Sequence, residues 1–277
     1  MFEADQAAGL RRLFARYPLQ VLALGGAGGA KASVATNLAV ALAEKGRRVM
    51  LMDGSVGELA AALGLNCRYE LSHVIAGDKR LADVLLTGPQ QIQVLPAARG
   101  LDQLDVLASA EARRLRQEFS QLRRPVDTLI VNARPLGITK VLDAFRGRAR
   151  TLMVVSEGAA SIKAAYREMK ALKHAAGAEE FDVVIGGIED AKEAAAIYAN
   201  IAEAAQRFLA VKLNFRGFIP GDVTFRTAQR VKRPVSLVNA GSASAGACQR
   251  IASEMEQLLV HRCSAMPKKE MNHAAAC

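Results

Sequence analysis

The feature that most constrains the fold is a repeated alternation of short apolar runs with longer segments of helical periodicity. Seven apolar runs occupy residues 19–26, 47–53, 92–97, 126–132, 150–157, 181–188 and 213–220. Helical patterns cover residues 32–46, 109–124, 137–147, 161–177, 191–209 and 247–262. Strands that are apolar throughout are buried on both faces, and strands separated by helices usually pair in parallel. The sequence therefore predicts an α/β protein with a mostly parallel sheet and helices on both faces.

The domain organisation follows from the absence of a break in this pattern. No linker or repeat divides residues 19–262, so we expect a single α/β domain there. Residues 1–18 form a separate leader, and residues 263–277 have the composition of a disordered tail. Hydrophobic residues make up 51% of the chain, which is enough for a sizeable core. The net charge of +10 permits attraction to nucleic acid, anionic lipid or an acidic protein and selects none of them.

Cysteine usage and hydropathy indicate a cytoplasmic protein. The four cysteines, Cys67, Cys248, Cys263 and Cys277, are far apart and form no metal-binding pair, so we expect reduced thiols and no metal site. The N-terminus has no apolar signal-peptide core. No run of about 18 apolar residues is present to span a membrane.

A glycine-rich stretch, GGAGGAKAS at residues 25–33, lies between the first strand and the first helix. Successive backbone N–H groups and a helix N-terminus face an anion at such a turn. A glycine-rich turn alone is weak evidence for a phosphate site. Lys31 and the loop amides are nevertheless the first candidates to hold one.

Several motifs in sequence order carry a family resemblance. The matching text is TNLAVALAEKGRRVMLMD, ALGLNCRYELSHVIAGDKRLADVLLTGP, IQVLPAARG, DTLIVN and SIKAAY. On these motifs the chain resembles the MinD/ParA family of deviant P-loop ATPases, and its second motif is typical of the flagellar branch, the FlhG/FleN regulators of flagellar number. The resemblance implies a MinD-like P-loop NTPase fold with ATP as the ligand. It assigns nucleotide binding to Gly25, Gly28, Gly29, Lys31, Ser33 and Asp53.

The resemblance fails at the residues that handle the nucleotide in the family. Gly26 stands in place of the family's signature lysine, Ala30 in place of its P-loop glycine and Ala32 in place of its P-loop hydroxyl residue. Ser55 replaces the second aspartate, Asn132 the Walker B-type aspartate and Gly186 the asparagine that reads the adenine. Mg²⁺ prefers hard, anionic oxygen ligands, and Ala32 and Asn132 remove the hydroxyl and one carboxylate. Phosphoryl transfer depends on positioning and charge stabilisation, so their joint loss should abolish turnover.

Two readings of the nucleotide site follow. We expect a pseudo-ATPase without catalytic residues. It would bind ATP weakly through Lys31 and the remaining amides, and we do not expect it to bind Mg²⁺. The alternative is a working MinD/ParA-type ATPase that dimerises on ATP and positions cargo at a membrane or on the nucleoid. The six substitutions argue against the alternative. The sequence leaves open whether the protein dimerises, and whether it is a divergent paralogue that serves another cell-pole or surface system.

The leader has the pattern of a short amphipathic helix. Asp5 is a good N-cap, Leu10, Leu13 and Phe14 fall on one face, and Pro18 ends the segment. About a dozen residues do not hold a helix alone in water, so this one needs a surface. That surface is either the chain's own core or another protein.

The resemblance favours another protein. FlhG-type proteins carry a DQA..LR.L helix that stimulates the GTPase FlhF. The corresponding residues here are Asp5, Gln6, Ala7, Leu10, Arg11 and Leu13, and Phe14 would join Leu10 and Leu13 as an anchor on the partner. Gln6 would help to orient the attacking water, a task that glutamine performs in other GTPases. The resemblance also implies contacts with a flagellar transcriptional activator or with switch-complex proteins, and a place at the inner membrane or cell pole.

Two charged or apolar helices have simpler interpretations. Residues 112–124 concentrate arginine, which is more typical of a solvated helix face than of a nucleic-acid surface, so no specific nucleic acid is expected. Ile251, Met255, Leu258 and Leu259 form a short stripe on the last helix without a basic rim. Such a stripe favours core packing over membrane contact.

Overall fold

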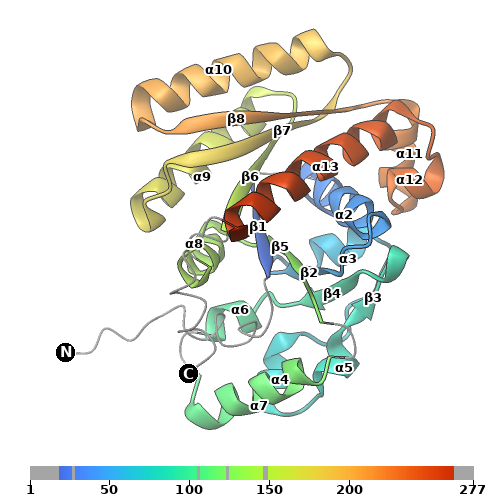
Figure 1. Cartoon of the computed structure of the whole chain (residues 1–277), viewed down its shortest axis with the longest axis vertical. Helices are drawn as coiled ribbons and strands as arrows, with labels where there is room; N and C mark the ends of the chain where they lie inside the picture. Colours follow the sequence, from blue (N-terminus) through green and yellow to red (C-terminus); the bar gives the residue numbers. More distant parts are fainter. Residues whose placement is uncertain (1–18, 27–28, 105–106, 123–124, 146–148, 265–277) are drawn as a thin grey trace.

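The computed structural model describes residues 19–26, 29–104, 107–122, 125–145 and 149–264, with side chains as far as residue 258. These residues build one sheet of eight strands in the order β3-β4-β2-β5-β1-β6-β7-β8 (Figure 1). All neighbours pair in parallel except β3, which runs antiparallel to β4. The predicted mostly parallel sheet is confirmed. The strands are β1 (Gln20–Gly26), β2 (Val49–Asp53), β3 (Leu86–Thr87), β4 (Gln93–Pro96), β5 (Thr128–Asn132), β6 (Ala149–Val155), β7 (Glu180–Ile188) and β8 (Lys212–Pro220).

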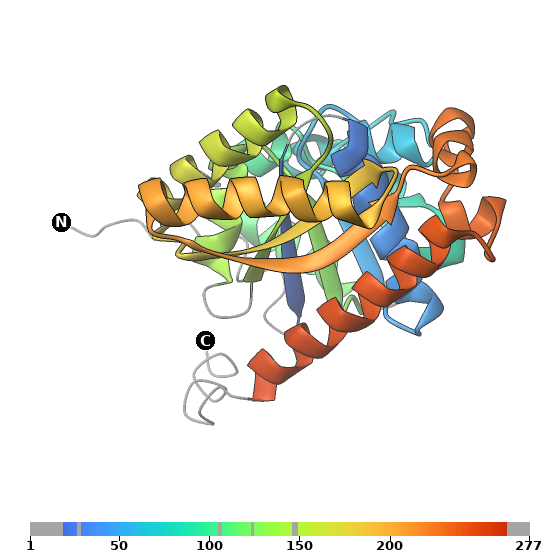
Figure 2. The ribbon, with the colours of Figure 1, turned by 90° about the horizontal axis from the view of Figure 1, so that it is seen from above.

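Helices cover both faces of this sheet. One face carries α2 (Gly29–Glu44), α3 (Glu58–Ala62), the short turn η1 (Pro89–Gln91), α11 (Val223–Val231), α12 (Val235–Val238) and α13 (Ala243–Ser264). The other carries α4 (Leu71–Ala76), α5 (Leu81–Val84), α6 (Gly100–Gln103), α7 (Ser109–Ser120), α8 (Pro135–Ala144), α9 (Ala159–Ala176) and α10 (Ala191–Leu209). Figure 2 shows the long helix α13 on the side of the sheet where it packs against α2.

The two cores explain why the strands are apolar throughout. Along β1, Val21 and Ala23 belong to one core cluster, whereas Leu22 and Leu24 belong to the other. Side chains alternate between the two faces of a strand, and here both faces are covered by helices. Each position of β1 is therefore buried, as the sequence pattern predicts.

The last helix packs against the core. Ile251 and Met255 are only 3% and 1% exposed, and Leu258 packs against the same cluster. This confirms core packing for these three residues, while the side chain of Leu259 lies outside the described residues. The helix ends at Ser264, so two residues assigned to the tail belong to it. On α7, Arg113 and Arg114 are exposed, as expected for a solvated face.

No helix in the described part of the chain is both long and apolar enough to cross a membrane.

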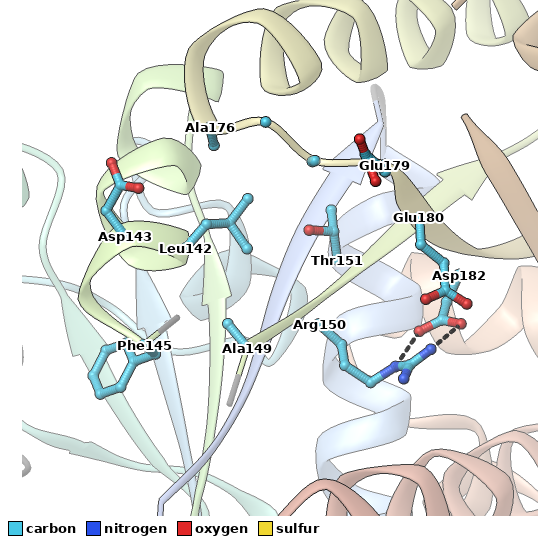
Figure 3. A pocket seen from close by; sticks show the side chains of 12 residues that line it. Leu142, Asp143, Phe145, Ala149, Arg150, Thr151, Ala176, Glu179, Glu180 and Asp182 are labelled. Atoms are coloured by element: carbon cyan, nitrogen blue, oxygen red, sulfur yellow. Dashed lines mark hydrogen bonds and ion pairs between the residues drawn. The ribbon is translucent and has the colours of Figure 1, made fainter. Parts of the chain in front are cut away.

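A buried carboxylate connects the last three strands of the sheet to α13. Asp182 on β7 is 1% exposed and accepts two hydrogen bonds from Arg150 of β6, at 2.6 and 2.8 Å (Figure 3). It also accepts one from Arg216 of β8 at 2.7 Å, and Arg216 donates to Glu254 of α13 at 2.7 Å. The arginine charges compensate the cost of burying the carboxylate, so each group depends on its partners.

Replacing Asp182→Ala should lower the free energy of unfolding by about 3–5 kcal/mol, because two mostly buried guanidinium groups lose their counter-charge. Urea unfolding measures this loss. Glu179→Ala, at an exposed position nearby, is the control and should change stability by less than about 0.5 kcal/mol. A similar small change for both variants would show that the network contributes nothing.

Candidate functional site

The candidate site lies where the central strands end. In the pairing register, Leu24 of β1 lies beside Asn132 of β5, and Asn132 lies beside Asp53 of β2. The glycine-rich stretch continues from β1 into α2, which begins at Gly29. The structure thus places Gly25, Gly29, Lys31 and Asp53 at one edge of the sheet, and their assignment to nucleotide binding stays a prediction. Gly28 lies outside the described residues.

The backbone at Gly26 excludes the family's signature lysine. Gly26 has φ +104°, and a Cβ atom built there would lie 2.1 Å from the carbonyl oxygen of Val154. Real side chains do not tolerate such a contact, and residues other than glycine rarely adopt this φ. The sequence predicted that the lysine's chemistry is lost, and the structure adds that the loop conformation has no room for that side chain.

The side-chain oxygens of Asp53 accept hydrogen bonds from the start of helix α3 and are not free to bind a ligand. Its side chain is fully buried and accepts hydrogen bonds from the backbone N–H groups of Leu59 at 2.8 Å, Ala60 at 3.4 Å and Ser55 at 3.3 Å. It therefore caps the N-terminus of α3. Burial raises the pKa of Asp53 to about 6, against the lowering effect of these N–H donors.

Asn132 is also engaged within the protein. Its Nδ2 donates to Glu58 Oε2 at 3.1 Å, and its backbone oxygen accepts from the N–H of Gly54 at 2.6 Å. Its Oδ1 is buried without a hydrogen-bond partner among the described residues. Within the described ranges, no three His, Cys, Asp or Glu side chains gather in a metal-binding arrangement.

Sequence reasoning missed one acidic residue at this edge, Glu168 of α9. It is 8% exposed, and its Oε2 accepts a hydrogen bond from the backbone N–H of Gly26 at 2.6 Å. Burial raises the pKa of Glu168, while the Gly26 N–H and the charge of Lys31 act to lower it. A signal was present, because the helical period places Glu168 on the same buried face as Ala165 and Leu172. A carboxylate at such a core position needs a partner.

Ser33 lies near the start of α2, and Gly186 lies beside it. Ser33 lines a pocket of about 520 Å³ between α2, α3 and the end of α11, together with Ala32, Thr36, Asn37, Glu58, Ala61, Ala62, Ala228, Gln229, Lys232 and Arg233. Gly186 on β7 lies against α2, and a Cβ atom there would be 3.3 Å from Val34 Cγ2. An asparagine at this position would have to displace Val34.

The pocket in Figure 3 belongs to the opposite edge of the sheet. It has a volume of about 350 Å³ and lies at the beginning of β6 and β7, with Thr151 and Glu180 among its lining residues. The glycine-rich loop follows the other end of the parallel strands. This pocket is therefore separate from the candidate site.

The predicted partner-binding residues of the leader lie outside the described residues. They are Asp5, Gln6, Ala7, Leu10, Arg11, Leu13 and Phe14. Their assignment stays a prediction.

Comparison with known proteins decides the family. No family model matches the chain. The chain is 34% identical over 230 residues to antiactivator FleN of Pseudomonas aeruginosa, a match that covers 82% of each protein. The chain belongs to the FleN-like branch of the MinD/ParA family. The resemblance inferred from the motifs is confirmed.

Solved structures of MinD share the fold of this FleN-like protein. The MinC:MinD complex of Aquifex aeolicus matches with a TM-score of 0.61 and 20% identity, covering 86% of this chain and 96% of that one. MinD of Pyrococcus horikoshii complexed with Mg-ADP matches with a TM-score of 0.59 and 18% identity, covering 88% and 98%. At these identities the likeness concerns the fold.

The raised pKa of Asp53 predicts how stability changes with pH. The ordinary value is 3.8 and the folded value about 6, so the folded state holds this proton more tightly than the unfolded chain. The ionised side chain therefore destabilises the fold, and this penalty grows as pH rises from about 4 to 6. It amounts to about 3 kcal/mol for a shift of about two pH units.

In Asp53→Asn the titrating group is absent. The free energy of unfolding of this variant minus that of the wild type should rise by up to about 3 kcal/mol between pH 4 and pH 7.5, because only the wild type loses stability as Asp53 ionises. Urea unfolding of both proteins at the two pH values measures the difference, and all other carboxyl groups titrate in both. A difference that stays constant with pH would contradict the assignment.

Proposed function

We propose that this FleN-like protein regulates flagellar number or placement through contacts with other proteins, without turning over ATP. The observation that carries the proposal is the pairing of a FleN-like chain with a loop whose Gly26 has no room for the signature lysine. FleN is named an antiactivator, and this name supports protein partners for the present chain. MinD likewise forms a complex with MinC.

The residues at the carboxyl edge support weak nucleotide binding. Lys31 and the backbone N–H groups of the loop are the groups that would contact phosphates. They do not provide a magnesium site, because Ala32 has no hydroxyl and the Asp53 oxygens accept backbone N–H groups. Mg²⁺ needs several hard oxygen ligands in near-octahedral geometry. We therefore derive no catalytic step through Mg·ATP.

The N-terminal leader is the proposed contact with an FlhF-type GTPase. Its apolar residues Leu10, Leu13 and Phe14 would anchor a helix on the partner, with Asp5 as N-cap. Gln6 would reach the partner's nucleotide and orient the attacking water. In this proposal residues 19–262 form the domain that carries the leader and binds further partners. An activator of flagellar transcription and switch-complex proteins are the candidates, and the protein works in the cytoplasm or at the cell pole.

The leader hypothesis predicts stimulation of a cognate FlhF. The full-length protein should raise the GTP hydrolysis rate of FlhF by about tenfold or more, as residues supplied in trans do in other GTPases. Gln6→Ala should abolish this effect, and Glu3→Ala, outside the predicted contacts, should preserve it. A peptide of residues 1–17 should act like the full chain. An unchanged GTPase rate with the wild-type protein would refute the hypothesis.

The loss of ATP turnover is tested separately. Phosphate release from Mg·ATP should stay at the level of a buffer control, with cooperative urea unfolding of the same sample as proof that the domain is folded. Light scattering should detect no ATP-dependent dimer. Micromolar affinity for Mg·ATP with steady phosphate release would support the alternative, a working MinD/ParA-type ATPase.

A further inference from the structure

A buried acidic side chain from a distant part of the sequence contacts the glycine-rich stretch where β1 ends. Glu168 lies 142 residues from Gly26, and its Oε2 accepts the Gly26 N–H at 2.6 Å. The carboxyl group lies against the loop, since a Cβ atom built on Gly25 would be 3.4 Å from Glu168 Cδ. The N–H of Gly26, the last residue of β1 before α2, is therefore already bonded to a carboxylate oxygen.

The second oxygen of this carboxylate is not used by the fold. Glu168 Oε1 is buried and has no hydrogen-bond partner among the described residues. The only nearby cation that acts on the carboxylate in the described structure is Lys31, itself 8% exposed. A buried carboxylate with one hydrogen bond is costly for stability. An apolar side chain would pack here at lower cost, beside Ala165 and Met169.

We propose that Glu168 is a built-in anion that competes with phosphate for the glycine-rich loop. It accepts the Gly26 N–H and interacts electrostatically with Lys31, the cation that would otherwise attract a phosphate. A phosphate at the loop would face this carboxylate in surroundings of low dielectric, where like charges repel strongly. Glu168 thus selects against nucleoside phosphates. The inference rests on the proposed function, in which the loop does not serve ATP turnover.

The charge of Glu168 can be separated from its hydrogen bond. Glu168→Gln keeps an oxygen that accepts the Gly26 N–H and removes the negative charge. Glu168→Met removes both and places an apolar side chain on a buried helix face, so we expect it to fold at least as stably as the wild type. Glu203→Gln removes one charge from an exposed position on α10 and is the matched control.

The experiment is calorimetric titration of the full chain with ADP in metal-free buffer at pH 7.5. Glu168→Gln and Glu168→Met should bind ADP about tenfold more tightly or better, whereas Glu203→Gln should match the wild type. Adenosine, which lacks phosphates, should bind all four proteins alike. Adding Lys31→Met to Glu168→Gln should cancel the gain, because it removes the cation that attracts the phosphates.

Each outcome bears on one claim. Unchanged ADP affinity in folded Glu168→Gln and Glu168→Met would overturn the inference and leave Glu168 as a structural tether of the loop. A gain for adenosine equal to that for ADP would also overturn it, since phosphate repulsion would not be the cause. Phosphate release from Mg·ATP by the wild type would instead overturn the proposed function, whatever these affinities are.

Discussion

The parallel pairing of β1, β5 and β2 is the constraint on which the site depends. Parallel strands end at the same edge of the sheet, and the register sets Asn132 beside both Leu24 and Asp53. Because helices cover both faces, these strands are buried and cannot shift without moving the two cores together. The glycine-rich stretch therefore lies at the same edge of the sheet as the polar residues that end β2 and β5.

Polar groups at this edge bond to the protein itself. Asp53 caps α3, Asn132 donates a hydrogen bond to Glu58, and Glu168 accepts one from the N–H of Gly26. In a working phosphate site such groups would be free to meet a metal ion or a charged ligand. Their internal hydrogen bonds give the edge of the sheet a structural role and agree with a protein that acts by contact.

The family assignment and the site geometry are two separate observations. The similarity to FleN extends over most of the chain, whereas the changes from the family pattern gather at the nucleotide edge. A fold preserved while its chemical groups are replaced is consistent with a scaffold for partners. The buried network around Asp182 stabilises the other end of that scaffold, between β6, β7, β8 and α13.

The sequence by itself determined the sheet, its helical layers, the glycine-rich turn and the family, because apolar periodicity and motif order are local properties of the chain. Only the tertiary structure decided what the polar residues do. The Gly26 conformation depends on Val154, and the roles of Glu168 and Asp182 depend on partners in distant segments. An acidic residue inside an apolar pattern signals that a partner is needed. Its identity depends on packing between elements, which no local pattern contains.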